Sequence, residues 1–413
     1  MSSADPRALR VDGTRLWDSL MELARIGATP KGGVARLALT ALDGEARRLF
    51  ARWCEAAGCT IRVDPIGNIF ARRAGTANDR APVMTGSHID SQPSGGKFDG
   101  AYGVLAGLEV IRALNDRGIS TAAPIEVVVW TNEEGSRFQP VMMGSGVHVG
   151  ALDLAASLAQ RDRAGVTVGE ALTAIGFAGA TPLGHPASAY FEAHIEQGPI
   201  LEDADTPIGV VTGALGLRWY DVRVIGQDAH AGPTPMRLRH DAMLAAAEIT
   251  VAVNAIALKH QPDGRGTVGA ITAHPNSRNV IPGRVDFTVD LRHSAEATLD
   301  QMESAFHAAC ADSERRHGVQ FTIERVSAYP VSTFDPALVA AVRNGAQALG
   351  LSHMNIVSGA GHDAIYMARV TPAAMIFIPC EGGISHNEIE SARHEHLEAG
   401  CNVLLQAILR AAE

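Results

Sequence analysis

The sequence predicts an α/β protein with a mostly parallel sheet, interrupted by an inserted α+β domain. Two observations carry this prediction. Strand-like runs alternate with helical patterns in the first part of the chain and again near its end, whereas the middle contains half-exposed, alternating strands. The chain has 413 residues, of which 46% are hydrophobic and 19% charged. Such a composition is typical of a globular protein with enough material for more than one core.

The outer segments show the strand–helix–strand rhythm of a parallel sheet that is covered by helices on both faces. In the first half, we expect helices over residues 47–58 and 102–118 and strands over 81–86 and 125–130. The same rhythm returns near the end of the chain, with expected elements at 354–358, 364–369, 373–379 and 398–412.

The middle of the chain follows a different order, β-α-β-β-α-β. The expected elements are 217–226, 241–260, 267–273, 284–292, 299–317 and 319–326. This order predicts a lid or dimerisation domain at 215–329 that is inserted into a first domain formed by 1–214 and 330–413. The inserted segment has a plausible size for a domain of its own.

The charge balance excludes several classes of protein. The chain has 45 acidic and 35 basic residues, a net charge of −10, which argues against nucleic-acid or anionic-membrane binding. No signal-peptide pattern is visible at the N-terminus, and no run of about 18 apolar residues occurs, so we expect no membrane span. The five cysteines are scattered without a C-x-x-C pair, which favours the cytoplasm.

A Gly-rich loop after the strand at 81–86 contains His88, Asp90 and Asp99. Ligand sites of open α/β sheets gather at the carboxyl ends of strands. Imidazole and carboxylate groups bind divalent metals, and a carboxylate can bridge two ions. We expect Asp90 to accept a hydrogen bond that orients the ring of His88. The alternative is an ordinary solvated turn.

Three further segments carry similar chemistry. Glu133 and Glu134 follow the strand at 125–130, and burying two adjacent carboxylates is costly unless a metal binds one of them. The other carboxylate can then serve as a general base. His194 lies two residues before Glu196, and His386 lies in a loop after another strand-like run. Three of the four segments follow strands, which favours one shared site over four exposed turns.

Other catalytic templates fit poorly. The chain has no G-x-S-x-G and no H-E-x-x-H motif. The segment 359–364 matches the dinucleotide pattern G-x-G-x-x-A, but Asp363 would face a pyrophosphate with like charge. Pro372 also leaves little room for the helix that should bind the phosphate. A dehydrogenase therefore remains only a remote alternative.

Seven motifs carry a family resemblance: Gly86-Ser-His-Ile-Asp90, Gly95-Gly-Lys-Phe-Asp-Gly100, Asn132-Glu-Glu-Gly-Ser-Arg-Phe138, His194-Ile-Glu-Gln-Gly198, Asp228-Ala-His-Ala-Gly232, Asn279-Val-Ile-Pro-Gly283 and Ser385-His386. In this order the motifs resemble the M20 family of dinuclear metal amidohydrolases and peptidases. The similarity covers almost the whole chain and is greatest to the hydantoinase/carbamoylase branch. That branch contains N-carbamoyl-L-amino acid hydrolases, β-ureidopropionases and allantoate amidohydrolases.

The resemblance implies two divalent metal ions, with zinc expected first and manganese, cobalt or nickel as alternatives. The residues that it assigns to the metals are His88, Asp99, Glu134, His194 and His386, with Asp99 bridging the two ions. It makes Glu133 the general base. It also implies that His230 reaches the oxyanion from the inserted domain of a partner subunit.

The resemblance further implies a small substrate that bears a ureido group and a carboxylate. Gln197 matches a ureido contact, Asn279 and Arg292 match contacts to the carboxylate, and His362 matches a pocket wall. The guanidinium of Arg292 is suited to a carboxylate because it can donate two parallel hydrogen bonds. A homodimer through the inserted domain is also implied.

We therefore expect hydrolysis of the carbamoyl C–N bond of an N-carbamoyl-L-amino acid or N-carbamoyl-β-alanine. The enzymatic alternatives are hydrolysis of allantoate or ureidoglycolate, and then aminoacylase or dipeptidase activity. An alternative of another class is an inactive binding protein on the same scaffold. Its mark would be a lost ligand or base, and no such position is missing.

Overall fold

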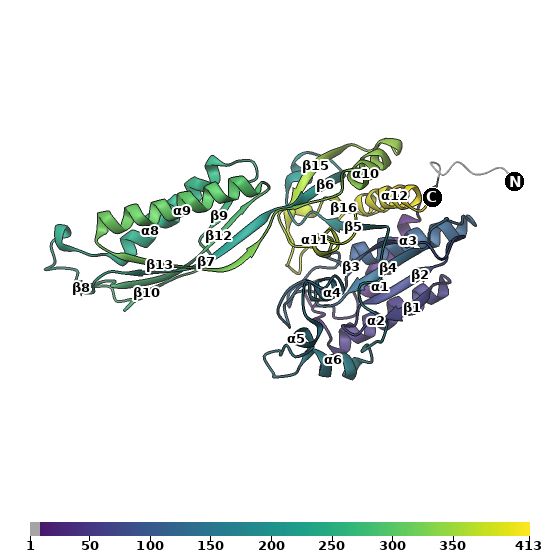
Figure 1. Cartoon of the computed structure of the whole chain (residues 1–413), viewed down its shortest axis with the longest axis horizontal. Helices are drawn as coiled ribbons and strands as arrows, with labels where there is room; N and C mark the ends of the chain where they lie inside the picture. Colours follow the sequence, from purple (N-terminus) through teal and green to yellow (C-terminus); the bar gives the residue numbers. More distant parts are fainter. Residues whose placement is uncertain (1–8) are drawn as a thin grey trace. The chain divides into compact units, whose positions relative to one another are not determined.

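The computed structural model describes residues 9–413, which divide into two compact units. One unit is built from the chain up to Thr212 and from Thr333 onward, and the other is Gly213–Ser332 (Figure 1). Since the chain enters and leaves the second unit once, that unit is an insertion. We call the first the main unit and the second the inserted unit.

The main unit is organised by a nine-stranded sheet with four parallel strands at its centre. In spatial order these strands are β4 (Ile125–Trp130), β3 (Val83–His88), β5 (Ala189–Ile195) and β16 (Ala373–Ile378), and every residue in them is buried. On either side, β2 (Ile69–Arg73) and β6 (Ile208–Ala214) pair antiparallel with β4 and β16. The predicted fold class is thus confirmed, with a mixed rather than uniformly parallel sheet.

Helices α3 (Ala101–Asp116) and α12 (His394–Ala411) contact the central strands, and nearly all of α3 is buried. Side-chain caps start the first two helices: Asp12 caps α1 (Gly13–Leu23), and Thr40 caps α2 (Ala41–Ala56). The remaining elements of this unit are β1 (Thr60–Val63), α4 (Met143–His148), α5 (Leu154–Leu158), α6 (Val168–Ile175), α7 (Ile200–Asp203), β14 (Ser332–Thr333), α10 (Pro336–Ala348), β15 (His353–Ser358), α11 (Asp363–Met367) and η3 (Glu381–Gly383).

The inserted unit has a hydrophobic core of its own beneath an antiparallel sheet. The strand order is β10-β12-β7-β13, with β9 also paired to β12, and helices α8 and α9 pack against this sheet. Its elements are β7 (Gly216–Ile225), β8 (Ala229–His230), η2 (Met236–Leu238), α8 (Ala242–Lys259), β9 (Arg265–Thr267), β10 (Ile271–His274), β11 (Val280–Ile281), β12 (Arg284–His293), α9 (Glu296–His317) and β13 (Gln320–Tyr329).

The single strand predicted at 267–273 is wrong, because the segment forms two strands. β9 pairs with the end of β12, and β10 pairs with its start. Between them the Thr288 hydroxyl accepts from the backbone N–H of Ala270, so a side chain replaces part of the ladder. The alternation of polar and apolar residues does not show where a side-chain hydrogen bond interrupts a strand.

Helix α8 is apolar on more than its core-facing side. It is the one helix of residues 9–413 that is long and apolar enough to cross a membrane by length and composition, although only 33% of its apolar window is buried. No membrane span was expected, since no unbroken run of about 18 apolar residues occurs; within α8, Glu248, Thr250 and Asn254 interrupt the apolar residues. Leu244, Val251 and Leu258 recur every seven residues and are all exposed.

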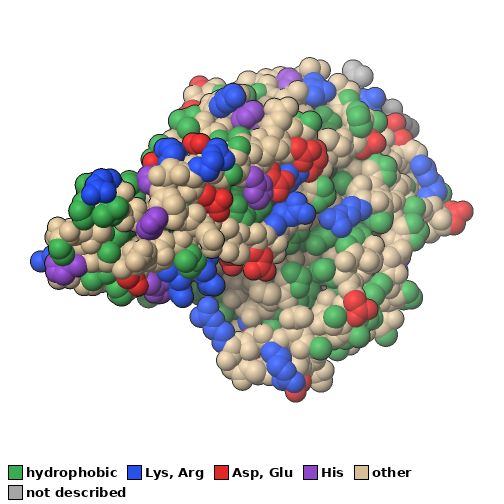
Figure 2. Space-filling view, turned by 60° about the vertical axis from the view of Figure 1, so that its left-hand side comes forward, with side chains coloured by type: hydrophobic (Ala, Val, Ile, Leu, Met, Phe, Trp, Pro, Cys, Tyr) green, Lys and Arg blue, Asp and Glu red, His purple; other side chains and the backbone are tan. Residues whose placement is uncertain are grey.

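The acidic net charge does not cover the surface uniformly. Acidic and basic side chains are interspersed on the face drawn in Figure 2. On this face, the acidic side chains are therefore not gathered into one patch without basic neighbours.

Candidate active site

The four central strands bring the predicted site residues of the main unit to one edge of the sheet. His88 ends β3, Glu133 and Glu134 follow β4, His194 lies near the end of β5, and His386 follows β16. The register pairs His88 with Trp130 of β4, and His194 with Phe377 of β16. Since these strands are parallel neighbours, their carboxyl ends form one site.

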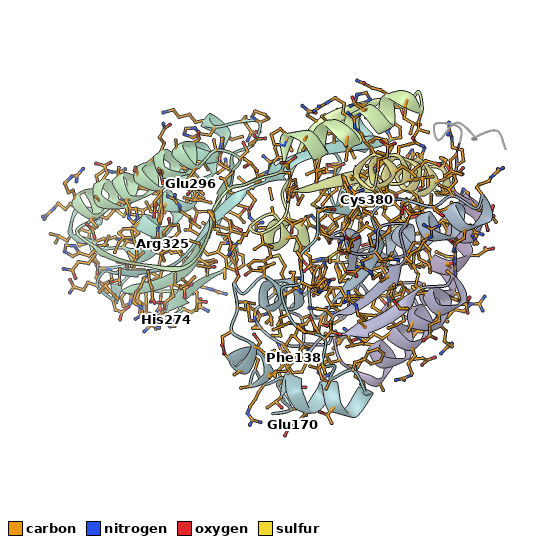
Figure 3. The ribbon with its side chains drawn as sticks, turned by 45° about the vertical axis from the view of Figure 1, so that its right-hand side comes forward. Phe138, Glu170, His274, Glu296, Arg325 and Cys380 are labelled. Carbon is orange, nitrogen blue, oxygen red and sulfur yellow. The ribbon has the colours of Figure 1, made fainter. Side chains whose placement is uncertain are left out.

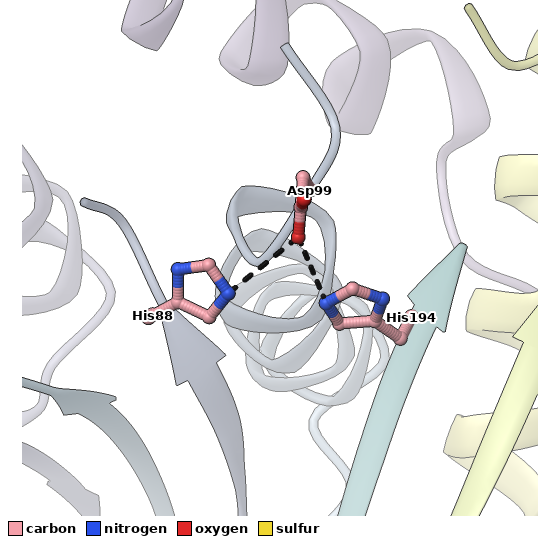
Figure 4. A group of neighbouring side chains, drawn as sticks. All are labelled: His88, Asp99 and His194. Carbon is pink, nitrogen blue, oxygen red and sulfur yellow. Dashed lines mark ion pairs between the residues drawn. The ribbon is translucent and has the colours of Figure 1, made fainter. Parts of the chain in front are cut away.

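Among residues 9–413, three groups of side chains could hold a metal, and two of these groups share Asp99. His88, Asp99 and His194 form the first of the two that share it (Figure 4). The Nε2 atoms of His88 and His194 lie 3.6 Å and 3.2 Å from Oδ1 of Asp99. Each Nδ1 lies 2.9 Å from a backbone carbonyl, that of Asp90 for His88 and that of Ile195 for His194. A carbonyl can only accept, so Nδ1 holds the hydrogen of the neutral ring. Each Nε2 lone pair then faces Asp99, as metal binding requires.

Asp99, Glu134 and His386 form the second cluster. Nε2 of His386 lies 3.4 Å from Oδ2 of Asp99 and 3.2 Å from Oε2 of Glu134. The two oxygens of Asp99 therefore face different clusters. A carboxylate in this position has the geometry of a bridging ligand.

The chemistry of the donors fits divalent cations. Asp99, Glu133 and Glu134 are buried together, yet in residues 9–413 their ion-pair partners are histidines and never Lys or Arg. Several buried carboxylates without cations would repel one another and lose hydration. A mixed set of imidazole nitrogens and carboxylate oxygens suits zinc and related metals.

Glu133 lies beside these clusters with one oxygen 3.5 Å from Nε2 of His88. Burial raises the pKa of Glu133 well above its usual range; His88 opposes this effect, and Asp363 and Glu134 add to it. Without a nearby cation, these surroundings therefore disfavour the charged form of this carboxyl group.

Asp90 differs in detail from the prediction. Its backbone carbonyl, rather than its carboxylate, orients the His88 ring, because the carboxylate lies 3.8 Å from Nδ1. That carboxylate accepts instead from the backbone N–H groups of Glu133 and Glu134, each at 3.3 Å. It thus joins the loops after β3 and β4, an arrangement that residue spacing cannot show.

Gly100 permits the approach of Asp99 to His88. Its φ is +65°, in the left-handed region, and a Cβ atom there would lie 2.4 Å from the His88 ring. The glycine of the Phe98-Asp-Gly100 motif is therefore required both by its backbone conformation and by the close imidazole.

Gln197 and His362, predicted to touch the substrate, both lie at the clusters. Nε2 of Gln197 donates to Oδ2 of Asp99 at 3.0 Å, and its buried Oε1 has no partner. The ring of His362 lies 4.6 Å from that of His194. Burial, with His194 nearby, holds the pKa of His362 well below its usual range, so its ring is neutral. Cys380, labelled in Figure 3, follows β16 and lies 3.7 Å from the carbonyl of Gly198.

Sequence reasoning missed Glu390, which is only 3% exposed. Its carboxylate accepts from the backbone N–H groups of Phe98 and Asp99. The only signal in the sequence is a glutamate a few residues after His386, which a surface turn would equally explain.

In the inserted unit, the structure brings together two of the three predicted residues. His230 in β8 is in register with Val280 of β11, and the N–H of Ala231 donates to the carbonyl of Asn279 at 2.9 Å. His230 and Asn279 are both exposed.

Arg292 lies at the other end of β12, where it is in register with Leu217 and Arg265 and forms an ion pair with Asp290 at 2.8 Å. The strand from Arg284 to Arg292 spans roughly 26 Å at about 3.3 Å per residue. Figure 1 likewise shows β8 and β9 at opposite ends of the unit. Within one inserted unit, Asn279 and Arg292 therefore cannot both bind one small carboxylate.

Comparison with known proteins identifies the family. The model of peptidase family M20/M25/M40 matches residues 84–410, and the chain belongs to this family. An N-carbamoyl-L-amino-acid amidohydrolase of Rhizobium meliloti is 50% identical over 98% of this chain and 97% of its own length. An allantoate amidohydrolase of Bacillus subtilis (strain 168) is 36% identical over 96% and 97%.

Among solved structures, a hydantoinase/carbamoylase family amidase from Burkholderia multivorans is 57% identical. It matches with a TM-score of 0.96 over 98% of this chain and 99% of that chain. The predicted family and its hydantoinase/carbamoylase branch are thus confirmed. The chain is a hydrolase of amide C–N bonds other than peptide bonds.

Proposed function

We propose that the chain hydrolyses the carbamoyl C–N bond of N-carbamoyl amino acids and releases ammonia, CO2 and the amino acid. The main support is the geometry at the buried edge of the sheet. There, two ligand clusters share Asp99, and a further carboxylate, that of Glu133, lies beside them. The similarity to an N-carbamoyl-L-amino-acid amidohydrolase at 50% identity supports this substrate class. Allantoate is the second candidate, because a relative named for it is 36% identical over nearly the whole chain.

In this proposal, His88, His194, Glu134, His386 and the shared Asp99 would hold two divalent ions, zinc first. When bound, such ions polarise a carbonyl and lower the pKa of water toward neutrality. Manganese, cobalt or nickel could occupy the same donors, since affinity order alone does not decide occupancy.

Glu133 acts as the general base in this proposal. Its carboxylate takes a proton from the water that attacks the ureido carbon and then returns a proton to the departing nitrogen. The C–N bond breaks and ammonia leaves. The carbamate that remains loses CO2 and frees the amino acid. Glu133 is buried beside His88, with one oxygen 3.5 Å from its Nε2, and this position next to the clusters supports the assignment.

We further propose that the active form is a homodimer, with 215–329 as the lid and dimerisation domain and 1–214 with 330–413 as the catalytic domain. Asn279 and Arg292 can share one substrate carboxylate only if they come from different copies. His230, beside Asn279, would then donate to the oxyanion from the second copy. The exposed Leu244, Val251 and Leu258 of α8 offer an apolar stripe for the contact between copies.

Mixing two variants tests the dimer. Arg292→Ala and His230→Ala should each be inactive alone, whereas co-expressed chains should regain up to about a quarter of the wild-type rate. Each mixed dimer would contain one intact site, since each site takes Arg292 from one chain and His230 from the other. If the mixture stays as inactive as its parents, Arg292 and His230 do not reach one site from different copies, and the proposed dimer is wrong.

The compartment follows from the same proposal. The five cysteines are all free and buried in the structure, and a small-molecule hydrolase with free thiols is suited to the reducing cytoplasm. No nucleic acid or membrane partner is proposed.

Ammonia release from a panel of substrates tests the function. The panel contains N-carbamoyl-β-alanine, several N-carbamoyl-L-amino acids and allantoate, each assayed with zinc or manganese. We expect the highest kcat/KM for an N-carbamoyl amino acid. Turnover of allantoate alone would replace the proposed substrate, and release of amino acids only from dipeptides would overturn the reaction.

A further inference from the structure

The loop that carries Asp99 is attached to the loop after β16 through one buried carboxylate, that of Glu390. Oε1 of Glu390 accepts from the backbone N–H of Phe98 at 3.0 Å and from that of Asp99 at 3.1 Å. Two backbone donors on one oxygen fix the position of the Asp99 main chain. Glu390 itself comes from a segment between η3 and α12, far from Asp99 in sequence.

The other oxygen of Glu390 reaches the second ligand cluster through Ser385. Oγ of Ser385 lies 2.9 Å from Oε2 of Glu390 and 3.1 Å from Oδ2 of Asp99. A hydroxyl has a single proton, so Ser385 donates to one carboxylate at a time. Ser385 also precedes His386, so Glu390 contacts the segments that carry Asp99 and His386, two of the three ligands of the second cluster.

The chain makes room for this carboxylate. A Cβ atom on Gly96 would lie 2.0 Å from both Cδ and Oε1 of Glu390, so only glycine leaves space for the side chain at that point. The Gly95-Gly96 pair thus admits Glu390 beneath the loop, in addition to any role in the turn itself.

We infer that Glu390 is a positioning residue, which holds the Asp99 loop and Ser385 so that Asp99 can face both metal clusters at once. The inference rests on the proposed function, because it takes Asp99 and His386 as metal ligands. Groups that orient metal ligands commonly change metal affinity by 10–100-fold when they are replaced. The same loss is expected here.

Two substitutions separate position from charge. In Glu390→Gln the amide oxygen still accepts both N–H groups, and the amide nitrogen donates to Ser385, whose own proton can then go to Asp99. In Glu390→Asp the charge stays, but the side chain is about 1.5 Å shorter and draws away from the N–H groups. A positioning role predicts that Gln substitutes well and Asp poorly, whereas a purely electrostatic role predicts the reverse.

Asp335→Ala is a matched control. The carboxylate of Asp335 also accepts from two backbone N–H groups, those of Ala337 and Leu338, at 2.9 and 3.0 Å. It caps α10 beside Ala373, at the start of β16 and hence at the opposite edge of the sheet. Its loss should lower the stability of the fold without touching the metal clusters.

The experiment is a titration of each metal-free protein with Zn²⁺ by calorimetry and with Co²⁺ by visible absorption, together with thermal unfolding. Glu390→Asp should bind about 10–100-fold more weakly and change the cobalt spectrum, while Glu390→Gln stays within a few-fold of wild type. Asp335→Ala should unfold at a lower temperature and bind metal normally. If Glu390→Asp does not fold, Ser385→Ala takes its place and should also weaken binding.

Three results would overturn the inference. Glu390→Asp, or its substitute Ser385→Ala, could bind as wild type. Glu390→Gln could be the weaker of the two Glu390 variants, which would assign the effect to charge. Asp335→Ala could lose as much affinity as Glu390→Asp, which would assign it to general stability. If the wild-type protein itself bound no metal, the proposed function would fail first, and that outcome is distinct from the other three.

Discussion

The two ends of strand β4 both place buried glutamates, and they balance the charge in opposite ways. At the start, Glu126 is fully buried and meets two arginines and a histidine: Arg62 at 2.5 Å, Arg72 at 3.0 Å and His185 at 2.9 Å. Burial raises the pKa of Glu126, but His185, Arg72 and Arg62 outweigh it and hold this pKa below its usual value.

Beyond the other end, Glu133 and Glu134 have no Lys or Arg partner among the described residues, and burial raises the pKa of Glu133. At the start of β4, side chains of the protein balance the carboxylate charge. Beyond its other end, the carboxylates need cations from solution, such as metal ions. Burial alone therefore does not mark a functional carboxylate; what distinguishes Glu133 and Glu134 is burial beside histidines without a Lys or Arg partner.

Glu133→Gln should have the largest effect on function. We expect kcat to fall about 10²–10⁴-fold, because an amide cannot accept the proton. Metal content should stay at the wild-type level. Metal analysis alongside steady-state kinetics checks both, and loss of metal with retained turnover per bound metal would make Glu133 a ligand.

Glu134→Gln, the neighbouring change, should act on metal binding. Removing one of the three donors of the second cluster should weaken the metal bound there by about tenfold or more. Competition with a chelator measures this loss. Normal metal affinity combined with lost turnover would exchange the roles of Glu133 and Glu134.

Glu126→Gln should lower the stability of the fold and leave metal binding unchanged. Replacing it leaves Arg62, Arg72 and His185 without their buried anion, and we expect unfolding to become easier by about 1–3 kcal/mol, since the arginines are partly exposed. Urea unfolding of the metal-free proteins measures the change. Metal affinity should not move; if it does, the two ends of β4 are coupled.

The smallest effect is a pH dependence of that stability difference. Because the folded-state pKa of Glu126 lies below its unfolded value near 4.3, its contribution is complete above that value. The contribution disappears as the pH falls through the folded-state pKa. The gap between wild type and Glu126→Gln should thus shrink as the pH falls below about 4; an undiminished gap at about pH 3 would contradict the assignment.

The sequence supports the central strands and the ligands well, because both follow from local patterns. Hydrophobic runs mark β4 and β16, and polar residues directly after such runs mark the edge of a sheet. The remainder depends on contacts between distant segments. The role of the Asp90 carboxylate, the place of Glu390 under the Asp99 loop, and the separation of Asn279 from Arg292 along β12 all arise only after the chain is folded.

The most direct test of the account is a metal titration followed by ammonia release. Protein stripped by a chelator receives increasing zinc, and ammonia from an N-carbamoyl-L-amino acid is measured at each step. We predict no activity without metal and a plateau near two ions per chain. Full activity in the metal-free protein would contradict the central claim, and a plateau near one ion would contradict the bridging role of Asp99.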